Sequence, residues 1–412
     1  MLKVGLIGAG ARGRSAYGEY CLNYPEEIQY VAAVDPVQDK LDLMKKDHGV
    51  TDDMLFTNED DFYKLGKCCD AVVIANQDKD HFYSIMACLD LGYDILLEKP
   101  ITPSKVELEQ IQAKLEETGC RIMVCYVLRY TPYFYKLKQL VDEKVIGDII
   151  GIDHTEYIGN YHMAHSFVRG NWRNAQKSSP IVLQKTSHDL DILTWLIGCD
   201  YKEVYSSGRL NYFKEENAPK GATKKCIDCP HKETCNYNAQ HFYLDPLPGG
   251  WLNNVMANPA GGGAEEFLAN SNYGTCVYQI DDNDVCDHQV AIFKFENGVD
   301  VTFTVTAFHQ DQVRYTRIFG TNGSIIADGH DNSITIEKYI MHSNGEKDIR
   351  TIYPKQVQSG HGGGDKLIME DFVKFLNDDK YEARTTMKDA LQSHYMAFDA
   401  EDSRINQKII KK

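Results

Sequence analysis

The strongest constraint on the fold is a glycine-rich turn near the N-terminus. Gly8, Gly10 and Gly13 form the pattern G-x-G-x-x-G directly after the apolar run Leu2–Ile7. Between a strand and a helix, such glycines permit a tight turn, close helix–strand packing and the approach of backbone to a pyrophosphate. The N-terminus of the following helix then offers unpaired N–H groups to the phosphates. The pattern therefore predicts a dinucleotide-binding α/β unit at the start of the chain.

The rest of residues 1–125 repeats this alternation of short apolar runs and helical patterns. Further strands are predicted at Tyr30–Val34, Asp70–Ala75, Asp94–Leu97 and Arg121–Cys125, and helices at 14–24, 37–48, 79–91 and 103–118. Apolar runs with little polar alternation, separated by helices, are typical of a parallel sheet that is covered on both faces. The fold class predicted for this region is a doubly wound α/β domain.

Residues 126–412 have a different pattern and are predicted to form a second domain. Helices at 131–143 and 188–197, a strand at 148–158, and period-2 strands at 288–296, 299–308, 313–319, 324–328 and 333–339 are predicted. Short turns between the later strands indicate a mostly antiparallel sheet. Residues 213–275 show little periodicity and are interpreted as an insertion rich in Gly, Asn, Pro and Cys. Residues 365–412 are predicted to be helical, with Asp365 as an N-cap.

The charge balance excludes two classes of partner. The chain carries 44 Lys+Arg and 60 Asp+Glu, a net charge of −16. Nucleic acids and anionic membranes are bound through clustered Lys and Arg, so neither is expected as a partner. No run approaches the ~18 apolar residues of a membrane span. The first residues, MLKVGLIGAG, resemble a strand rather than an export signal, so a soluble cytoplasmic protein is expected.

An acidic residue follows the glycine-rich turn where ribose contacts are expected. Asp35 ends the second predicted strand, 22 positions after Gly13. Its carboxylate would bind the ribose hydroxyls of NAD and repel the 2′-phosphate of NADP. Arg12 and Arg14 leave NADP open, because a nearby arginine can accommodate that phosphate; both could equally be solvated residues at a helix start. Asn76, just after the third predicted strand, is another candidate for contact with the cofactor.

A Glu-Lys-Pro motif lies at the C-terminal end of a predicted parallel strand. Ligands bind at this edge of such sheets, and Lys99 could reach both a nicotinamide and a substrate from there. Other motifs occur in a definite order: GAGARG at 8–13, AAVD at 32–35, EKP at 98–100, Asn171-Trp172-Arg173, and the helix start at 185–191. With these motifs, the chain resembles the Gfo/Idh/MocA family of oxidoreductases across nearly its whole length.

The resemblance implies a Rossmann domain followed by an α/β domain with an open antiparallel sheet, through which the chain is expected to form a homo-oligomer. Family members move a hydride between NAD(P) and a hydroxyl carbon of a sugar, polyol or related compound. By resemblance, Lys99 assists proton transfer, His188 lies beside the reacting hydroxyl, and Trp172 and Arg173 line the pocket. The predicted cofactor-binding residues are therefore Gly8, Gly10, Ala11, Arg12, Gly13, Asp35, Asn76, Glu98, Lys99, Trp172 and Arg173.

The predicted catalytic residues are Lys99, His188 and Lys185. Oxidation of an alcohol needs a base that titrates near the operating pH. The helix N-terminus and the two lysines should lower the pKa of His188 and keep it neutral. His188 could instead be a helix cap or a core histidine. One departure from the family concerns Gln184, which stands where many relatives carry Asp; Lys185 could supply hydrogen bonding and charge in its place, or the reaction could differ.

Three functions are compatible with these residues. The first is an NAD(P)-dependent dehydrogenase acting on a secondary alcohol of a sugar, glycoside or cyclitol. The second is an NAD-dependent glycosidase or epimerase that uses transient oxidation with no net redox change. The third is a non-catalytic NAD-binding sensor, against which the presence of Lys99 and His188 argues.

Other residues are candidates on local pattern alone. Tyr126, Arg129 and Tyr130 follow the last strand of the first domain and could face the cleft or pack the domain interface. His81 opens a predicted helix. His361 is followed by three glycines, which could let the backbone bring His361 into the pocket or could form a turn before the final helices.

A cysteine cluster predicts a possible structural zinc. Cys226, Cys229 and Cys235 form C-x2-C-x5-C, a spacing compatible with a tetrahedral metal. A fourth ligand is missing from the motif and is sought among His231, His241, Cys276 and Cys286. The alternative is a Cys-rich insertion with free thiols or an occasional disulfide.

Overall fold

The computed structural model describes residues 1–245, 263–341, 346–357 and 360–412, which contain two sheets. The first sheet has the order β3-β2-β1-β4-β5-β6, and all its strand pairs are parallel. Its strands are β1 (Leu2–Ile7), β2 (Ile28–Val34), β3 (Leu55–Phe56), β4 (Ala71–Ile74), β5 (Asp94–Leu97) and β6 (Ile122–Val124). This confirms the doubly wound α/β fold expected from the sequence.

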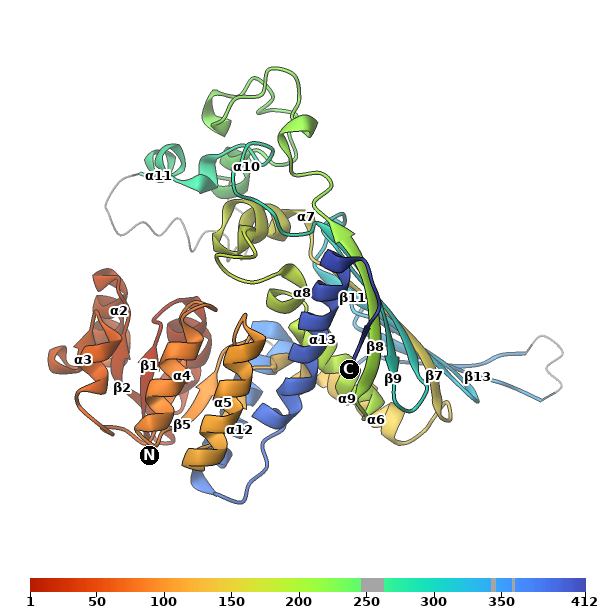
Figure 1. The fold of residues 1–412 in the computed structure, drawn as a ribbon, viewed down its shortest axis with the longest axis horizontal. Helices are drawn as coiled ribbons and strands as arrows, with labels where there is room; N and C mark the ends of the chain where they lie inside the picture. The colour runs from red at the N-terminus through yellow and green to blue at the C-terminus, as the bar shows by residue number, and fades with distance from the viewer. Residues whose placement is uncertain (246–262, 342–345, 358–359) are drawn as a thin grey trace.

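Helices cover both faces of this sheet (Figure 1). They are a π-helix at Ala11–Tyr17, α1 (Gly18–Asn23), α2 (Gln38–His48), α3 (Glu59–Tyr63), α4 (His81–Asp90) and α5 (Lys105–Thr118). The strands have almost no exposed positions, which explains why they read as continuous apolar runs. The two short elements β3 and α3 were not among the predicted elements.

The second sheet has nine strands in the order β14-β13-β12-β11-β7-β10-β9-β8-β15. Only the pair of β10 and β7 is parallel among the strands described, so the expected mostly antiparallel sheet is confirmed. The strands are β7 (Ile149–Tyr157), β8 (Tyr201–Arg209), β9 (His288–Phe295), β10 (Asp300–Thr306), β11 (Val313–Gly320), β12 (Gly323–Asp328), β13 (Ser333–Lys338), β14 (Asp348–Ile352) and β15 (Ile410–Lys411).

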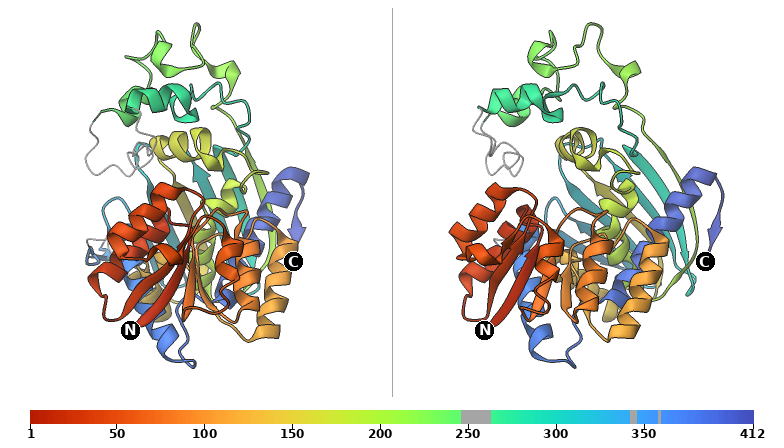
Figure 2. Two further views of the ribbon diagram at one scale, coloured as in Figure 1. Left: turned by 90° about the vertical axis from the view of Figure 1, so that its left-hand side faces the viewer. Right: turned by 60° about the vertical axis from the view of Figure 1, so that its left-hand side comes forward.

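The helices of the second domain lie mainly on one face of this sheet. They are α6 (Pro132–Asp142), α7 (Asn160–His162), α8 (Ile181–Gln184), α9 (Ser187–Ile197), α10 (Ala239–Tyr243), α11 (Ala264–Asn270), α12 (Gly364–Asn377) and α13 (Met387–Asn406). Figure 1 shows α6, α9 and α13 between the large sheet and the N-terminal domain. The insertion that holds α10 and α11 lies apart from them, at the top of both views in Figure 2. Residues 246–262 of the predicted insertion lie outside the described residues.

The last part of the chain returns to the N-terminal domain. On α12, Ile368, Met369 and Phe372 pack in one core with Val4 and Leu6 of β1. The predicted N-cap of this helix is wrong: Gly363 occupies that position, and Asp365 lies in the first turn with its carboxylate bonded to Arg12. Helix α12 therefore ties the two domains together close to the glycine-rich turn.

None of the helices that the structure describes is long and apolar enough to cross a lipid bilayer.

Candidate active site

A cavity of about 490 Å³ opens at the C-terminal edge of the first sheet. Four of the predicted cofactor-binding residues line it, namely Gly8, Gly10, Asp35 and Asn76. Its other lining residues are Val34, Pro36, Lys40, Thr57, Asn58, Glu59, Asp60, Ala75, Gln77, Asp80 and Tyr83. This is the edge where open α/β sheets bind their ligands.

The three glycines of the turn differ in their surroundings. Gly8 has a φ of +94°, and a Cβ there would lie 2.4 Å from the backbone nitrogen of Asn76. A Cβ at Gly13 would lie 2.4 Å from the carbonyl oxygen of Gly8. A Cβ at Gly10 would meet no described atom within 4 Å. Gly8 and Gly13 thus permit tight packing, whereas Gly10 leaves open space where a pyrophosphate could approach the backbone, so the residues fit a bound dinucleotide.

Asp35 is held rigidly at the cavity. Its carboxylate accepts hydrogen bonds from the backbone nitrogens of Ala9 and Val37, both at 3.0 Å, and from Lys40 Nζ at 3.1 Å. The side chain is thereby oriented at the end of β2, the position predicted for contact with a ribose.

Asn76 follows β4 on the opposite side of the same cavity. Its amide nitrogen donates to Glu59 Oε1 at 2.9 Å and to Ser84 Oγ at 2.8 Å. Its buried Oδ1 has no hydrogen-bond partner within the described part of the chain.

Both arginines near the turn are bonded to carboxylates. Arg12 donates to Glu98 at 2.6 Å and to the two carboxylate oxygens of Asp365 at 2.8 and 3.1 Å. Arg14 pairs with Asp47 at 2.9 Å. Burial works to raise the pKa of Glu98, but Arg12 and Lys99 outweigh it and keep that pKa below its ordinary value. The guanidinium groups are thus already neutralised by neighbouring carboxylates.

Lys99 lies at the interface of the two domains. Its Nζ donates to the backbone carbonyl of Gln184 at 2.7 Å. Burial lowers the pKa of Lys99 to about 8, although Glu98 and Asp78 oppose the shift. Because the contact uses a main-chain oxygen, the amide side chain of Gln184 is not required for it.

His188 is buried at the start of α9. Its ring lies 5.7 Å from the Tyr126 ring and 6.4 Å from the His361 ring, measured between centroids. Its Nδ1 has no hydrogen-bond partner among the described residues. Burial is the largest cause that holds its pKa well below the ordinary value, followed by Lys99 and Arg314. The direction agrees with that expected from the sequence, but the main cause does not.

A buried ionic network lies beneath these residues. Lys185 Nζ is 3.2 Å from Glu156, and Arg314 Nε is 3.0 Å from Glu156 and 2.6 Å from Asp189. His154 lies 2.9 Å from Asp189. Burial raises the pKa of Glu156 and lowers that of Lys185. Of the residues in this network, only Lys185 was among the site residues predicted from the sequence.

In β7, alternate side chains face the core, and this pattern could have indicated two of the missed residues. His154 and Glu156 stand two positions apart and both face the core, in a strand pattern where apolar residues are expected. Burying a charge is costly unless it is paired, so a polar pair on the inner face is itself evidence of a site.

Trp172 and Arg173 point to different partners. The Trp172 indole nitrogen donates to Asp78 at 3.4 Å, and the Ser179 hydroxyl donates to the same carboxylate at 3.0 Å. Asp78 belongs to the N-terminal domain, so it links the two domains beside Lys99. Arg173 is paired with Asp282 at 2.6 Å. The predicted pocket roles of both residues stay predictions.

The remaining candidates fall into two groups. His361, at φ +51°, is held by Asp365 at 3.0 Å and lies beside His188. Arg129 and Tyr130 pack the domain interface through Asp191 and Asp371, at 2.8 and 2.7 Å. Tyr126 belongs to the same interface group and reaches Ser393 at 2.9 Å, whereas His81 contacts the Pro100 carbonyl within the N-terminal domain at 2.7 Å.

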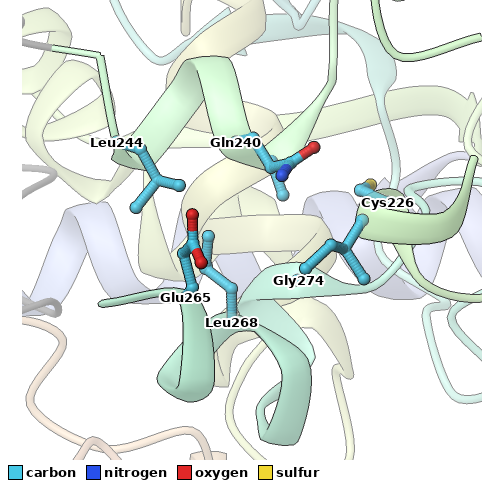
Figure 3. Close-up of a pocket in the computed structure, with 8 residues that line it drawn as sticks. Cys226, Gln240, Leu244, Glu265, Leu268 and Gly274 are labelled. Atoms are coloured by element: carbon cyan, nitrogen blue, oxygen red, sulfur yellow. The ribbon is translucent and has the colours of Figure 1, made fainter. Parts of the chain in front are cut away.

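The cysteine motif gives no support to the predicted zinc. Within residues 1–245, 263–341, 346–357 and 360–412, no three side chains of His, Cys, Asp or Glu are arranged to hold a metal, and Cys226, Cys229 and Cys235 are free thiols. The Cys226 sulfur lies 3.7 Å from the Arg169 guanidinium. Cys226 also lines a small pocket of about 10 Å³ together with Leu244 and Leu268 (Figure 3).

The proposed fourth ligands also have other contacts. His231 and His241 contact the Lys220 carbonyl and Asp245, at 2.9 and 2.8 Å. Cys276 and Cys286 are buried free thiols. The zinc predicted from the spacing is therefore not supported among the described residues, where Cys226 packs with Ala239, Tyr243 and Leu268.

Two family models match this chain. The model described as "Oxidoreductase family, NAD-binding Rossmann fold" matches residues 2–126, and "Oxidoreductase family, C-terminal alpha/beta domain" matches residues 138–400. YteT of Bacillus subtilis strain 168 is 26% identical over 75% of this chain and 73% of its own length. Inositol 2-dehydrogenase 2 of Paenarthrobacter aurescens is 25% identical over 49% of this chain and 58% of its own length.

A solved structure, an NAD binding oxidoreductase from Klebsiella pneumoniae, superposes with a TM-score of 0.71 at 16% identity. It covers 100% of this chain and 98% of its own. At 16% sequence identity, this likeness shows a shared fold alone.

Proposed function

Since this chain belongs to the Gfo/Idh/MocA family of oxidoreductases, we propose that it is an NAD-dependent dehydrogenase acting on a secondary alcohol of a sugar, glycoside or cyclitol. The observation that carries this proposal is the buried Lys99, whose pKa of about 8 allows an amine to exchange a proton near neutral pH. His188 lies in the same buried group of side chains and provides a second, neutral, polar contact.

The proposed cofactor is NAD rather than NADP. Asp35 would accept hydrogen bonds from ribose hydroxyls and repel a 2′-phosphate. Arg12 and Arg14, which could have received that phosphate, are each paired with a carboxylate. When bound, NAD supplies the acceptor for the hydride that leaves the substrate carbon.

The proposed role of Lys99 is to take the alcohol proton. Its neutral amine donates one N–H to the Gln184 carbonyl, which directs the nitrogen lone pair elsewhere. His188 would hold the substrate hydroxyl through a ring nitrogen. Lys185 is held by Glu156, and this pair would orient the substrate rather than exchange its proton.

The exposed face of the second sheet supports a proposed homo-oligomer. Large apolar side chains stand on that face at Tyr205, Val290, Ile292, Phe319 and Ile326, each at least 37% exposed. Figure 1 shows the face turned away from the helices that cover the opposite side. Large apolar side chains exposed on one face of a sheet are typical of protein interfaces, so we propose that a second copy covers them.

A panel of sugars, polyols and glycosides with NAD and with NADP tests the function. The expected result is NADH formation, read as nicotinamide absorbance, with at least one panel member. A product formed with no net NADH would favour the redox-neutral glycosidase or epimerase instead. The absence of any turnover would contradict the dehydrogenase and leave the non-catalytic sensor.

A further inference from the structure

His361 is a titratable residue beside the proposed reaction site that has no role in the mechanism above. Its ring centroid lies 6.4 Å from that of His188, with 45° between the two ring planes. The His361 side chain is 42% exposed, whereas His188 is only 8% exposed. Two hydrogen bonds of about 2.8 Å, one from each ring, can reach hydroxyls on neighbouring carbons of one substrate across this separation.

The backbone holds His361 in a conformation that is unusual for a residue with a side chain. His361 has φ +51° and ψ +42°, in the left-handed region. Such strain is concentrated at binding and catalytic sites, where the surrounding structure enforces it. A Cβ at Gly360 would overlap the carboxylate of Asp365. A Cβ at Gly364 would overlap the backbone carbonyl of Val127 in the N-terminal domain. The glycines of this loop therefore let His361 lie close against Asp365.

Asp365 fixes which ring nitrogen of His361 is left for a ligand. Its two carboxylate oxygens lie 3.0 and 3.1 Å from His361 Nδ1. Burial alone would raise the pKa of Asp365, but the hydrogen bond from His361 and the charge of Arg12 outweigh it and hold that pKa well below its ordinary value. An ionised carboxylate repels a nitrogen lone pair, so Nδ1 carries a proton and donates it to Asp365. All polar contacts of His361 with described residues use Nδ1, which leaves Nε2 for a ligand.

Arg12 connects this histidine–aspartate pair to the glycine-rich turn. Its guanidinium donates to the two oxygens of Asp365, at 2.8 and 3.1 Å, and to Glu98 at 2.6 Å. Its Nη1 also lies 3.3 Å from His361 Nδ1. Because Arg12 and His361 donate to the same carboxylate, Asp365 fixes the position of the His361 ring relative to the glycine-rich turn.

We propose that His361 binds a second hydroxyl of the substrate, on a carbon next to the one that is oxidised, so that the substrate is a vicinal diol. The proposal rests on the proposed dehydrogenase function and narrows its substrates to alcohols with a free neighbouring hydroxyl. His188 binds the reacting hydroxyl, and Nε2 of His361 binds its neighbour. A hydroxyl both donates and accepts, so it forms this bond with either charge state of the ring. Asp365 and Arg12 are positioning residues for His361.

Nitrogen NMR of protein labelled at histidine tests the orientation of the ring without a substrate. The His361 signals are identified as those missing from His361→Asn. In the wild type, Nδ1 of His361 should give the signal of a protonated nitrogen. Asp365→Asn should shift that signal, because the charge that fixes the proton is removed. An unprotonated Nδ1 in the wild type would overturn the assignment of Nε2 to the substrate.

Deoxy sugars measure the proposed contact directly. The probes are methyl glucoside and methyl galactoside, each compared with its 2-, 3- and 4-deoxy analogues. Binding to the NADH-loaded protein is measured by calorimetry, and kcat/KM with NAD by NADH absorbance. In the wild type, an analogue that lacks the hydroxyl next to the oxidised carbon should lose at least about tenfold in both quantities, because it leaves a hydrogen-bonding group of the site without its partner.

His361→Asn removes the proposed contact alone. The amide nitrogen of Asn occupies the place of Nδ1 and keeps the contact with Asp365, and Asn tolerates the left-handed backbone, so the thermal unfolding temperature should not change. The KM for the parent sugar should rise about tenfold with kcat nearly unchanged, since this hydroxyl does not react. The deoxy analogue should lose nothing further in this variant. His241→Asn, in an exposed pair with Asp245 at the same four-residue spacing, is the control and should behave as the wild type.

The outcomes separate this proposal from the dehydrogenase function. A loss on deoxygenation that is as large in His361→Asn as in the wild type would overturn the contact, as would equal wild-type binding of all analogues. A loss that disappears in His361→Asn, with no NADH formed from any sugar, would support the contact and contradict the dehydrogenase. Oxidation of the deoxy sugars as efficiently as the parent would support the dehydrogenase and reject the role of His361. Failure of every sugar to bind would contradict both.

Discussion

Lys99 and His188 are two residues from different domains whose environments make them chemically useful. The Lys99 amine and the His188 ring are both buried, and burial lowers the pKa of each. Buried titratable groups with strongly shifted pKa values in a cleft are typical of functional sites. The EKP motif and the helix start at 185–191 predicted both residues only as part of the ordered set of motifs that carries the family resemblance.

Alanine substitutions should separate proton transfer from folding. We expect Lys99→Ala and His188→Ala each to lower turnover by about a hundredfold or more, because each would remove a group proposed to exchange or hold the reacting proton. Steady-state kinetics on the substrate found in the panel measures the loss, and thermal unfolding checks the fold. A variant that keeps near-full turnover would remove that residue from the proposed mechanism.

Asp78 should set the pH at which the protein becomes active. The neutral form of Lys99 predominates above its pKa of about 8, so the rate of alcohol oxidation should rise as the pH increases through that value. The Asp78 carboxylate favours the charged lysine and so raises its pKa. In Asp78→Asn the rise should therefore shift to lower pH, by about half a unit or more.

The measurement is kcat/KM against pH for the wild type and this variant. Asp142→Asn, a surface change on α6, is the matched control and should leave the profile where it was. A profile that stays in place in Asp78→Asn, or moves to higher pH, would contradict the assignment of the rise to Lys99.

At the scale of elements, the strand predictions were correct where the order of polar and apolar residues in the sequence matches which side chains are buried. The parallel strands are buried on both faces, and in β10 (DVTFTVT) buried Val301, Phe303 and Val305 alternate with polar residues, so these patterns were visible. Strand β8 was missed because its sequence YKEVYSSGR mixes charged and small residues. Strand β14 was missed because it is exposed along its length and pairs only with β13 among the described strands.

In the glycine-rich turn, substitutions at two different glycines should affect NAD binding and protein stability separately. Gly10 has an extended backbone that any residue adopts, and its Cβ would point into open space. Gly10→Val should therefore keep the unfolding temperature while weakening NAD binding at least about tenfold, because the side chain occupies the path of the pyrophosphate. Gly13→Ala should instead lower stability by about 1–3 kcal/mol, since its Cβ would overlap the Gly8 carbonyl.

Fluorescence titration with NADH and chemical denaturation measure the two effects. Unchanged NAD affinity in Gly10→Val would contradict the placement of the cofactor at the turn. A loss of stability in Gly10→Val equal to that in Gly13→Ala would contradict the distinction drawn between the two positions.

At the scale of the whole molecule, the proposed homo-oligomer depends on the open face of the large sheet. Ile292 on β9 and Ile326 on β12 are 45% and 37% exposed on that face. We expect the double variant Ile292→Lys, Ile326→Lys to dissociate the oligomer, because each buried apolar side chain contributes about 1.5–3 kcal/mol and a lysine cannot replace it. Light scattering coupled to size exclusion measures the mass.

Val106→Lys provides the control for this experiment. Val106 is 62% exposed on α5, in the N-terminal domain. The substitution therefore removes one exposed apolar side chain that lies away from the sheet. Its mass should equal that of the wild type. A wild-type protein that is monomeric at all concentrations, or a double variant that stays associated, would contradict the proposed interface.

Local sequence predicted the glycine-rich turn and the order of the two domains, because these depend on spacing within short segments. Lys99 and His188 were proposed from the family resemblance that the ordered motifs carry. The tertiary structure alone decided which distant groups meet them. Arg12 could have faced a phosphate but is bonded to Asp365, 353 positions away. Arg314 joins Glu156 and Asp189, and the zinc suggested by three cysteines is not supported, because charge pairing and burial are fixed only when separate elements pack together.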